Sequence, residues 1–269
     1  MGNFFLGSKW RFRLILMGIG IGVGIFAWKT LPMVDNTPSL VPVPPVTSST
    51  VPLLAKRKIV IIGDSITQSG SQRGGYVWLL QEYLKNLYPE QPKEIINAGV
   101  SGSKSVDMQQ RFEADVLNPR PDLVMINVGV NDVWHSFKNP GQDTGVPLNR
   151  YRESLSSMVK AAQSRGITVV LLSPTLIYEN LNSPENQRLA SYVAAMREIA
   201  QEYDCHFVDL NMPFRHVIST YQRYGGQNHN ILTRDGIHLN PAGNQMTAYT
   251  ILRTLGVPEA QIQELKVGN

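Results

Sequence analysis

Short apolar runs alternate with longer amphipathic segments along most of the chain. The apolar runs predict five strands, at Lys58–Gly63, Glu94–Ala98, Leu123–Val128, Thr168–Leu172 and His206–Leu210. Helical periodicity between them predicts helices at Tyr76–Tyr88, Val106–Leu117, Arg150–Arg165 and Glu185–Tyr203, and Asn240-Pro241 is typical of the start of a last helix. Because strands alternate with helices, the pattern predicts an α/β fold whose parallel sheet is covered on both faces.

The N-terminal region has a different pattern from the rest. An uncharged apolar run, Leu14–Ala27, follows three basic residues, which is typical of a membrane anchor or a signal peptide with its N-terminus in the cytoplasm. We expect residues 1–31 to contain a cytoplasmic tail and an uncleaved single-pass anchor. The alternative is a signal segment that is cleaved, so that the protein is secreted. Residues 32–55 are rich in Pro, Ser and Thr and predict an extended linker, so that residues 56–269 form a domain outside the cytoplasm.

Composition narrows the choice of partners. Most of the formal net charge of +4 comes from the N-terminal region, and the remainder is nearly balanced. We therefore expect a membrane contact through the N-terminal segment and no nucleic acid partner. The single Cys205 forms no intrachain disulfide, so cysteine content gives no information on the compartment. The spacing of the histidines is not typical of a zinc site, so we expect no metal.

Four short polar motifs follow one another along the chain, and the first three come directly after predicted strands. They are Gly63-Asp64-Ser65, Asn97-Ala-Gly-Val-Ser-Gly102, Gly129-Val-Asn131-Asp132 and Asp235-Gly-Ile-His238. Parallel sheets bind ligands at the carboxyl ends of their strands, so we expect the first three motifs to meet at one edge. Singly, each motif has a structural explanation as a helix cap or a turn. The ordered set supplies the groups of an acyl-transfer site.

The candidate catalytic groups are Ser65, Asp235 and His238. Ser65 would attack an ester carbonyl, His238 would take its proton, and Asp235 would fix the tautomer of the imidazole. The backbone N–H groups of Ser65 and Gly102 and the side-chain amide of Asn131 would form the oxyanion hole.

These motifs resemble the four blocks of the SGNH hydrolases, also called the GDSL lipase/esterase family. The Ser, Gly, Asn and His of the family match Ser65, Gly102, Asn131 and His238, and the resemblance covers roughly residues 58–255. It implies a flavodoxin-like three-layer α/β/α sandwich with a five-stranded parallel sheet. It also implies ester hydrolysis through an acyl-enzyme, without metal or other cofactor. Ile66 stands where the family name has Leu, which is a conservative change.

The loops beyond the strand ends are expected to set specificity. Trp134 is the candidate substrate contact, either stacked on a sugar ring or beside the acyl group, and core packing is the alternative. We expect loops from Trp134 to Leu148, after Tyr178, and over Tyr221–Asn230. The prediction is an extracytoplasmic serine esterase for short-chain, acetyl-type esters of small molecules or carbohydrates. The alternatives are an O-acetyltransferase acting on envelope sugars, a lysophospholipase or thioesterase, and a noncatalytic envelope-binding module. Nothing in the sequence indicates an oligomeric state.

Overall fold

The computed structural model describes residues 53–138, 141–226 and 230–265, all within the unit Val46–Asn269. The predicted anchor over residues 1–31 and nearly all of the predicted linker lie outside the described residues, and the domain boundary at residue 56 stays a prediction. Among the helices that are described, none has both the length and the apolar character to cross a bilayer.

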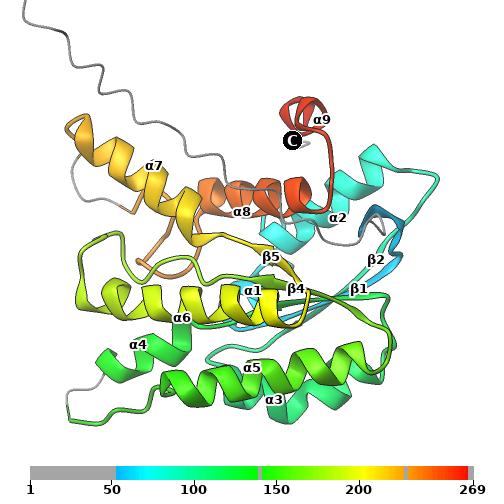
Figure 1. The fold of residues 1–269 in the computed structure, drawn as a ribbon. Coiled ribbons are helices and arrows are strands. Elements are labelled where there is room, and N and C mark those ends of the chain that lie inside the picture. Colours follow the sequence, from blue (N-terminus) through cyan, green and yellow to red (C-terminus); the bar gives the residue numbers. More distant parts are fainter. Residues whose placement is uncertain (1–52, 139–140, 227–229, 266–269) are drawn as a thin grey trace, which may run out of the picture. The chain divides into compact units, whose positions relative to one another are not determined.

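The centre of this unit is a single sheet of five parallel strands in the order β2-β1-β3-β4-β5 (Figure 1). The strands are β1 (Lys58–Gly63), β2 (Glu94–Gly99), β3 (Leu123–Asn127), β4 (Thr168–Leu172) and β5 (His206–Val208). The apolar residues of β1 and β3 are buried along the whole strand, as expected for central strands covered on both faces. The five predicted strands and their parallel arrangement are therefore confirmed.

Helices cover both faces of the sheet (Figure 1). On one face α3, α5 and α6 pack side by side, and α2 packs with α8 on the other. The helical elements are η1 (Leu53–Ala55), α1 (Ser65–Ser69), α2 (Tyr76–Leu87), α3 (Ser105–Phe112), η2 (Glu113–Leu117), α4 (Val130–Lys138), α5 (Leu148–Gln163), α6 (Pro184–Glu202), α7 (Asn211–Arg223), α8 (Pro241–Thr254) and α9 (Glu259–Glu264). This is the three-layer α/β/α sandwich that the sequence predicts.

Several local predictions were wrong. The segment from Trp134 to Leu148 was expected to be a loop, but its first residues continue α4 as far as Lys138. The loop expected over residues 221–230 begins later than predicted, because residues 221–223 belong to α7, an amphipathic helix with Phe214 and Ile218 buried. The helix predicted over residues 106–117 is confirmed as helical over that range, and it differs only in that the turn after residue 112, η2, is π-helical.

The fifth strand is shorter than predicted. It ends at Val208 because the chain turns directly into α7. The Ser173 hydroxyl accepts the backbone N–H groups of Leu210 and Asn211 at 2.9 and 3.1 Å, and an Asp209 carboxylate oxygen accepts that of Met212. These bonds satisfy N–H groups at the start of the helix, where no intrahelical partner exists.

Candidate active site

Three of the four motifs meet where the strand order reverses. β1 lies between β2 and β3. The chain therefore adds β2 on one side of β1 and then β3 on the other side. Such a switch point leaves a crevice at the carboxyl ends of the strands. Ser65 begins α1 directly after β1, Gly102 follows β2, and Asn131 lies in the first turn of α4 after β3. The topology therefore places a hydroxyl, a glycine loop and an amide at one edge of the sheet.

The start of α1 is fixed by a buried carboxylate. Asp64 is the N-cap of this helix, and its side chain accepts the backbone N–H of Ile66 at 2.9 Å. Ser65 is the first helical residue, a position whose backbone N–H has no partner within the helix. The cap thus holds the Ser65 hydroxyl and N–H at the end of β1, next to the crevice.

The fourth motif reaches this edge from a distant part of the chain. His238 Nε2 lies 3.0 Å from Ser65 Oγ, and His238 Nδ1 lies 2.7 Å from an Asp235 carboxylate oxygen. The other carboxylate oxygen of Asp235 accepts the backbone N–H groups of Ile237 and His238 at 3.0 and 2.8 Å. The structure therefore brings the three candidate catalytic side chains into one hydrogen-bonded line.

The charge of Asp235 is stabilised in this line. Partial burial alone would raise the pKa of its carboxyl group, but hydrogen bonds from the His238 side chain and from the His238 and Ile237 N–H groups lower the pKa to about 2. The carboxylate is therefore ionised at neutral pH. An ionised partner on Nδ1 leaves the lone pair of a neutral imidazole on Nε2, which faces the Ser65 hydroxyl.

The predicted oxyanion donors lie beside this line. Asn131 Nδ2 donates to the Ser103 carbonyl oxygen at 3.1 Å and lies 3.4 Å from a carboxylate oxygen of Asp64. Ser103 directly follows Gly102, which has a φ of +78° and open space around its Cβ position. The left-handed backbone, rather than crowding, therefore favours glycine here.

Two buried acids, Asp64 and Asp132, flank the amide. The sequence predicts a helix cap at Asp64 or Ser65 and no catalytic role for either acid. Asp132 accepts hydrogen bonds from the N–H and the hydroxyl of Ser105, which joins the start of α4 to the start of α3. Burial raises the pKa of Asp64 and of Asp132 to about 6 in each case. Both acids lie within the predicted motifs, next to Ser65 and Asn131. This position in the sequence is the signal from which they could have been predicted as residues of the site.

Trp134 lies one turn beyond Asn131 on α4. Its indole N–H donates to the Tyr178 hydroxyl at 3.2 Å, and Lys138 Nζ lies 4.7 Å from the centre of its ring. The side chain is partly buried and packs against the hydrophobic core. Trp134 therefore packs against the core through part of its surface, and its contact with substrate stays a prediction.

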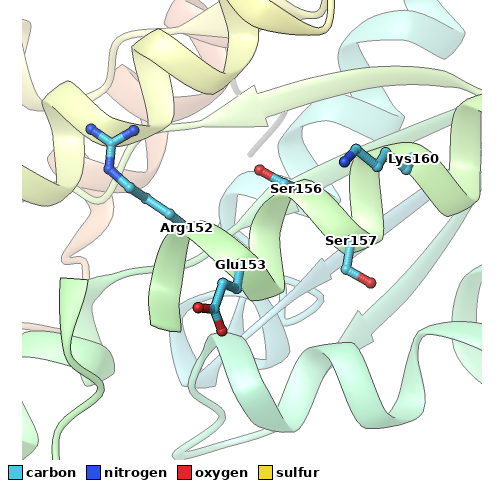
Figure 2. Close-up of a pocket in the computed structure, with 5 residues that line it drawn as sticks. All are labelled: Arg152, Glu153, Ser156, Ser157 and Lys160. Atoms are coloured by element: carbon cyan, nitrogen blue, oxygen red, sulfur yellow. The ribbon is translucent and has the colours of Figure 1, made fainter. Parts of the chain in front are cut away.

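The hollows on the surface give little further information on the site. One of about 480 Å³ borders the glycine loop, and it is lined by Val100, Ser101, Gly102, Ser103, Asp107, Gln110 and Arg111. Another, of about 550 Å³, is lined only by residues of α5 (Figure 2), and none of them belongs to the four motifs. Within the described ranges, no three His, Cys, Asp or Glu side chains are grouped so as to hold a metal ion.

Comparison with known proteins places this site in a family. The model of the GDSL-like lipase/acylhydrolase family matches residues 61–246. The chain belongs to this family and is a serine ester hydrolase, as the motifs predict. An acetylxylan esterase of Geobacillus stearothermophilus is 31% identical over 211 residues, which are 74% of this chain and 94% of that protein.

Solved structures agree with this assignment. The crystal structure of an acetyl xylan esterase is 33% identical, covers 73% of this chain and 98% of its own, and superposes with a TM-score of 0.68. Three structures of the Geobacillus stearothermophilus esterase are catalytic mutants in which a serine, a histidine or an aspartate is replaced by alanine. These are 30% identical, cover 74–75% of this chain and 94–95% of theirs, and have a TM-score of 0.68.

Proposed function

We propose that the protein hydrolyses acetyl and other short-chain esters, carbohydrate esters first among them, through a Ser-His-Asp acyl-enzyme mechanism. The observation that supports this most directly is the hydrogen-bonded line from Asp235 through His238 to Ser65, with distances of 2.7 and 3.0 Å. A serine hydroxyl is a poor nucleophile unless a neighbouring base takes its proton. The imidazole is within reach of that proton.

In the first half of the reaction, Ser65 Oγ forms a bond to the ester carbonyl carbon while His238 Nε2 accepts the hydroxyl proton. Asp235 holds the Nδ1 proton and stabilises the imidazolium that forms. The intermediate collapses when its bond to the alcohol oxygen breaks, and His238 gives its proton to that oxygen. The alcohol leaves, and the acyl group remains on Ser65.

In the second half, water attacks the acyl-enzyme and His238 takes a proton from it. The bond from the acyl carbon to Ser65 Oγ then breaks, the proton returns to the serine oxygen, and the carboxylic acid leaves. Both tetrahedral intermediates carry an oxyanion, which the N–H groups of Ser65 and Gly102 and the Asn131 amide stabilise. Asn131 has two amide hydrogens: one donates to the Ser103 carbonyl at 3.1 Å, and the other would turn from its long 3.4 Å contact with Asp64 to the oxyanion.

Three observations favour a small acyl group on a sugar. Two of the similar proteins are acetylxylan esterases. Tyr178 contacts Gly236, next to Asp235, and Trp134 donates a hydrogen bond to the Tyr178 hydroxyl. Tyr178 is 41% exposed, and an accessible aromatic residue can contact a substrate ring. We propose that Trp134 and Tyr178 together contact the alcohol portion of the ester.

The proposal also includes a place in the cell. The basic residues before the apolar run over residues 14–27, followed by a Pro-rich linker, support a single-pass anchor with the hydrolase domain outside the cytoplasm. The test is fractionation of cells that express the full-length chain, followed by protease treatment of intact cells. Recovery in the soluble cytoplasmic fraction would contradict this part of the proposal.

The central test uses the purified full-length protein with p-nitrophenyl acetate and with acetylated xylo-oligosaccharides. We expect acetate to be released into water, with rates that fall from acetate to octanoate esters. Transfer of acetyl to an added sugar in preference to water would instead identify an acetyltransferase. A preference for long chains would identify a lysophospholipase or thioesterase. No turnover of any ester and no labelling by a fluorophosphonate would identify a noncatalytic module.

A further inference from the structure

The segment that contains Asp235 and His238 is a loop outside the sheet. We call residues 231–240 the histidine loop. Its two ends are joined by backbone hydrogen bonds from Arg234 N to the His238 carbonyl at 2.7 Å and from Asn240 N to the Leu232 carbonyl at 3.1 Å. These bonds close the loop on itself, but they do not set its position relative to Ser65. Contacts from another part of the chain must do so.

Glu179 provides such contacts. It lies between β4 and α6, and it is only 7% exposed. One carboxylate oxygen accepts the backbone N–H groups of Leu232 and Thr233 at 2.8 and 2.9 Å and the Thr233 hydroxyl at 2.9 Å. The other accepts the Ile231 N–H at 2.7 Å. Across the described ranges no Lys or Arg pairs with it, so its charge is satisfied chiefly by the first residues of the histidine loop.

Thr233 extends this contact toward the reacting groups. While its hydroxyl donates to Glu179, the hydroxyl oxygen also accepts the N–H of Gly236 at 3.2 Å. Gly236 directly follows Asp235, the partner of the imidazole. Two hydrogen bonds therefore lead from the Glu179 carboxylate to the residue next to the proposed triad acid.

Tyr178 holds the same glycine from the other side. Its N–H donates to the Gly236 carbonyl at 2.6 Å, and its ring is so close that a Cβ on Gly236 would lie 2.5 Å from a ring carbon. Gly236 has a φ of +92°, so a larger residue would also strain the backbone. Consecutive residues, Tyr178 and Glu179, thus contact the histidine loop at its turn and at its start.

The segment that makes these contacts is itself fixed by α6. The buried Asn186 side chain accepts the N–H of Ile177 at 3.0 Å and donates to the carbonyls of Ile177, Tyr178 and Asn180 at 2.7, 3.2 and 2.8 Å. Tyr178 is held in the left-handed region, with a φ of +58°. Non-glycine residues in that conformation persist where their surroundings determine them, and they are enriched at functional sites.

We propose that Glu179 is a positioning residue for the acid–base half of the site. Its carboxylate fixes the histidine loop so that His238 faces Ser65, and it touches neither substrate nor reacting atoms. The inference rests on the proposed function of Ser65 and His238. An amide cannot replace this carboxylate, because one of its two polar atoms is a donor and would face an N–H group of the loop.

The test is Glu179→Gln in the full-length protein. We expect kcat for p-nitrophenyl acetate to fall about 10- to 100-fold, because small misplacements of catalytic groups have effects of that size. KM should stay within about twofold, since the crevice around Gly102 and Asn131 is unchanged. The rate at which a fluorophosphonate labels Ser65 should fall by the same factor as kcat. Wild-type kcat and wild-type labelling in the folded variant would overturn the proposal.

A matched control is Asp122→Asn. The Asp122 carboxylate accepts the backbone N–H groups of Arg57 and Lys58, both at 2.9 Å, at the start of β1. The substitution makes the same change from acid to amide at the opposite end of the strand from Ser65. We expect its kcat to be that of the wild type whatever happens to its melting temperature. An equal loss of kcat in both variants would show that general destabilisation is the cause.

A second pair keeps the test decisive if Glu179→Gln does not fold. Thr233→Val removes the hydroxyl that joins Glu179 to Gly236, and Thr233→Ser retains it. We expect about a tenfold loss of kcat for the first and recovery of most of it in the second. Equal kcat in the two variants would contradict the inference. If the wild type itself hydrolyses no ester and takes no label, the proposed function fails instead, so the two failures are distinct.

Discussion

The nucleophile half and the histidine half of the site are built in different ways. Ser65, Gly102 and Asn131 each follow the end of a central or neighbouring strand by a few residues, so the sheet itself places them. His238 belongs to a loop that the sheet does not contain, and side chains from distant segments place it. The first half depends on the hydrophobic pattern of the strands. The second depends on individual polar contacts, and a single substitution in them should be more disruptive.

The halves also differ in the direction of their carboxyl pKa shifts. Burial raises the pKa of Asp64 and of Asp132 to about 6, whereas hydrogen bonds at the histidine loop bring that of Asp235 to about 2. A raised pKa means that ionisation of the buried acid lowers the free energy of unfolding as pH rises from about 4 to above 6. The Asp235 interaction stabilises the fold above pH 4, and that stability is lost as pH falls through 2.

The largest expected loss of kcat comes from removing either the serine of the nucleophile half or the histidine of the histidine half. Ser65→Ala and His238→Ala should each lower kcat by about 10⁶-fold, and the double variant should be no worse, because the two groups act as a unit. Steady-state assays with p-nitrophenyl acetate measure this, and thermal melting serves as the control for folding. If the two losses multiplied in the double variant, the halves would be acting independently.

A smaller loss of kcat is expected from a substitution that affects only the nucleophile half. Asn131→Ala removes one oxyanion donor and should lower kcat by about 10²- to 10³-fold with little change in KM. Asn131 also donates to the Ser103 carbonyl, so the melting temperature should fall slightly. Assays on the same ester separate the two effects. A variant that raised KM without lowering kcat would place Asn131 in ground-state binding instead.

Asp64→Asn should separate stability from activity. The amide retains an oxygen to cap Ile66 but removes a buried charge, whose cost at pH 8 is at most about 3 kcal/mol for the shift from 3.8 to about 6. We expect a higher melting temperature at pH 8 and a smaller decrease of stability between pH 4 and 7. The new NH₂ group would face the Asn131 amide, so kcat should fall about tenfold. Melting curves and kcat over that pH range test both effects, and a gain in kcat would contradict them.

The smallest effect is expected at the aromatic border of the histidine half. Trp134→Ala should raise KM for acetylated xylo-oligosaccharides about two- to tenfold, because a stacked aromatic contact contributes about 0.5–1.5 kcal/mol. Trp134→Phe keeps a ring but loses the indole N–H that contacts Tyr178 at 3.2 Å. Its KM should lie between the KM of the wild type and that of Trp134→Ala. KM for p-nitrophenyl acetate is the control. An equal rise for both substrates would indicate a packing defect.

The same contrast explains what the sequence predicts. The runs that form β1 and β3 are continuous and apolar, and Asn240 caps α8 through Gly243 N at 3.0 Å, so these elements follow from local pattern. α4 was missed because a short helix that starts in a polar motif presents few periodic positions.

The contact between Ser65 and His238 joins residues far apart in the chain. The ordered set of polar motifs and the family that they resemble predict it, whereas periodicity does not. Glu179 contacts residues 231–233 across a separation of more than fifty positions. No local signal marks such a residue. Its importance becomes visible only when the donors around its carboxylate are known.

Covalent labelling tests the central claim most directly. The full-length protein is treated with a fluorophosphonate, and the modified peptide is identified by mass spectrometry. We predict a single adduct on Ser65 in the wild type, and formation of that adduct should be slowed by orders of magnitude in His238→Ala. An adduct on a different residue, or labelling of Ser65 at the wild-type rate in the absence of His238, would contradict the account.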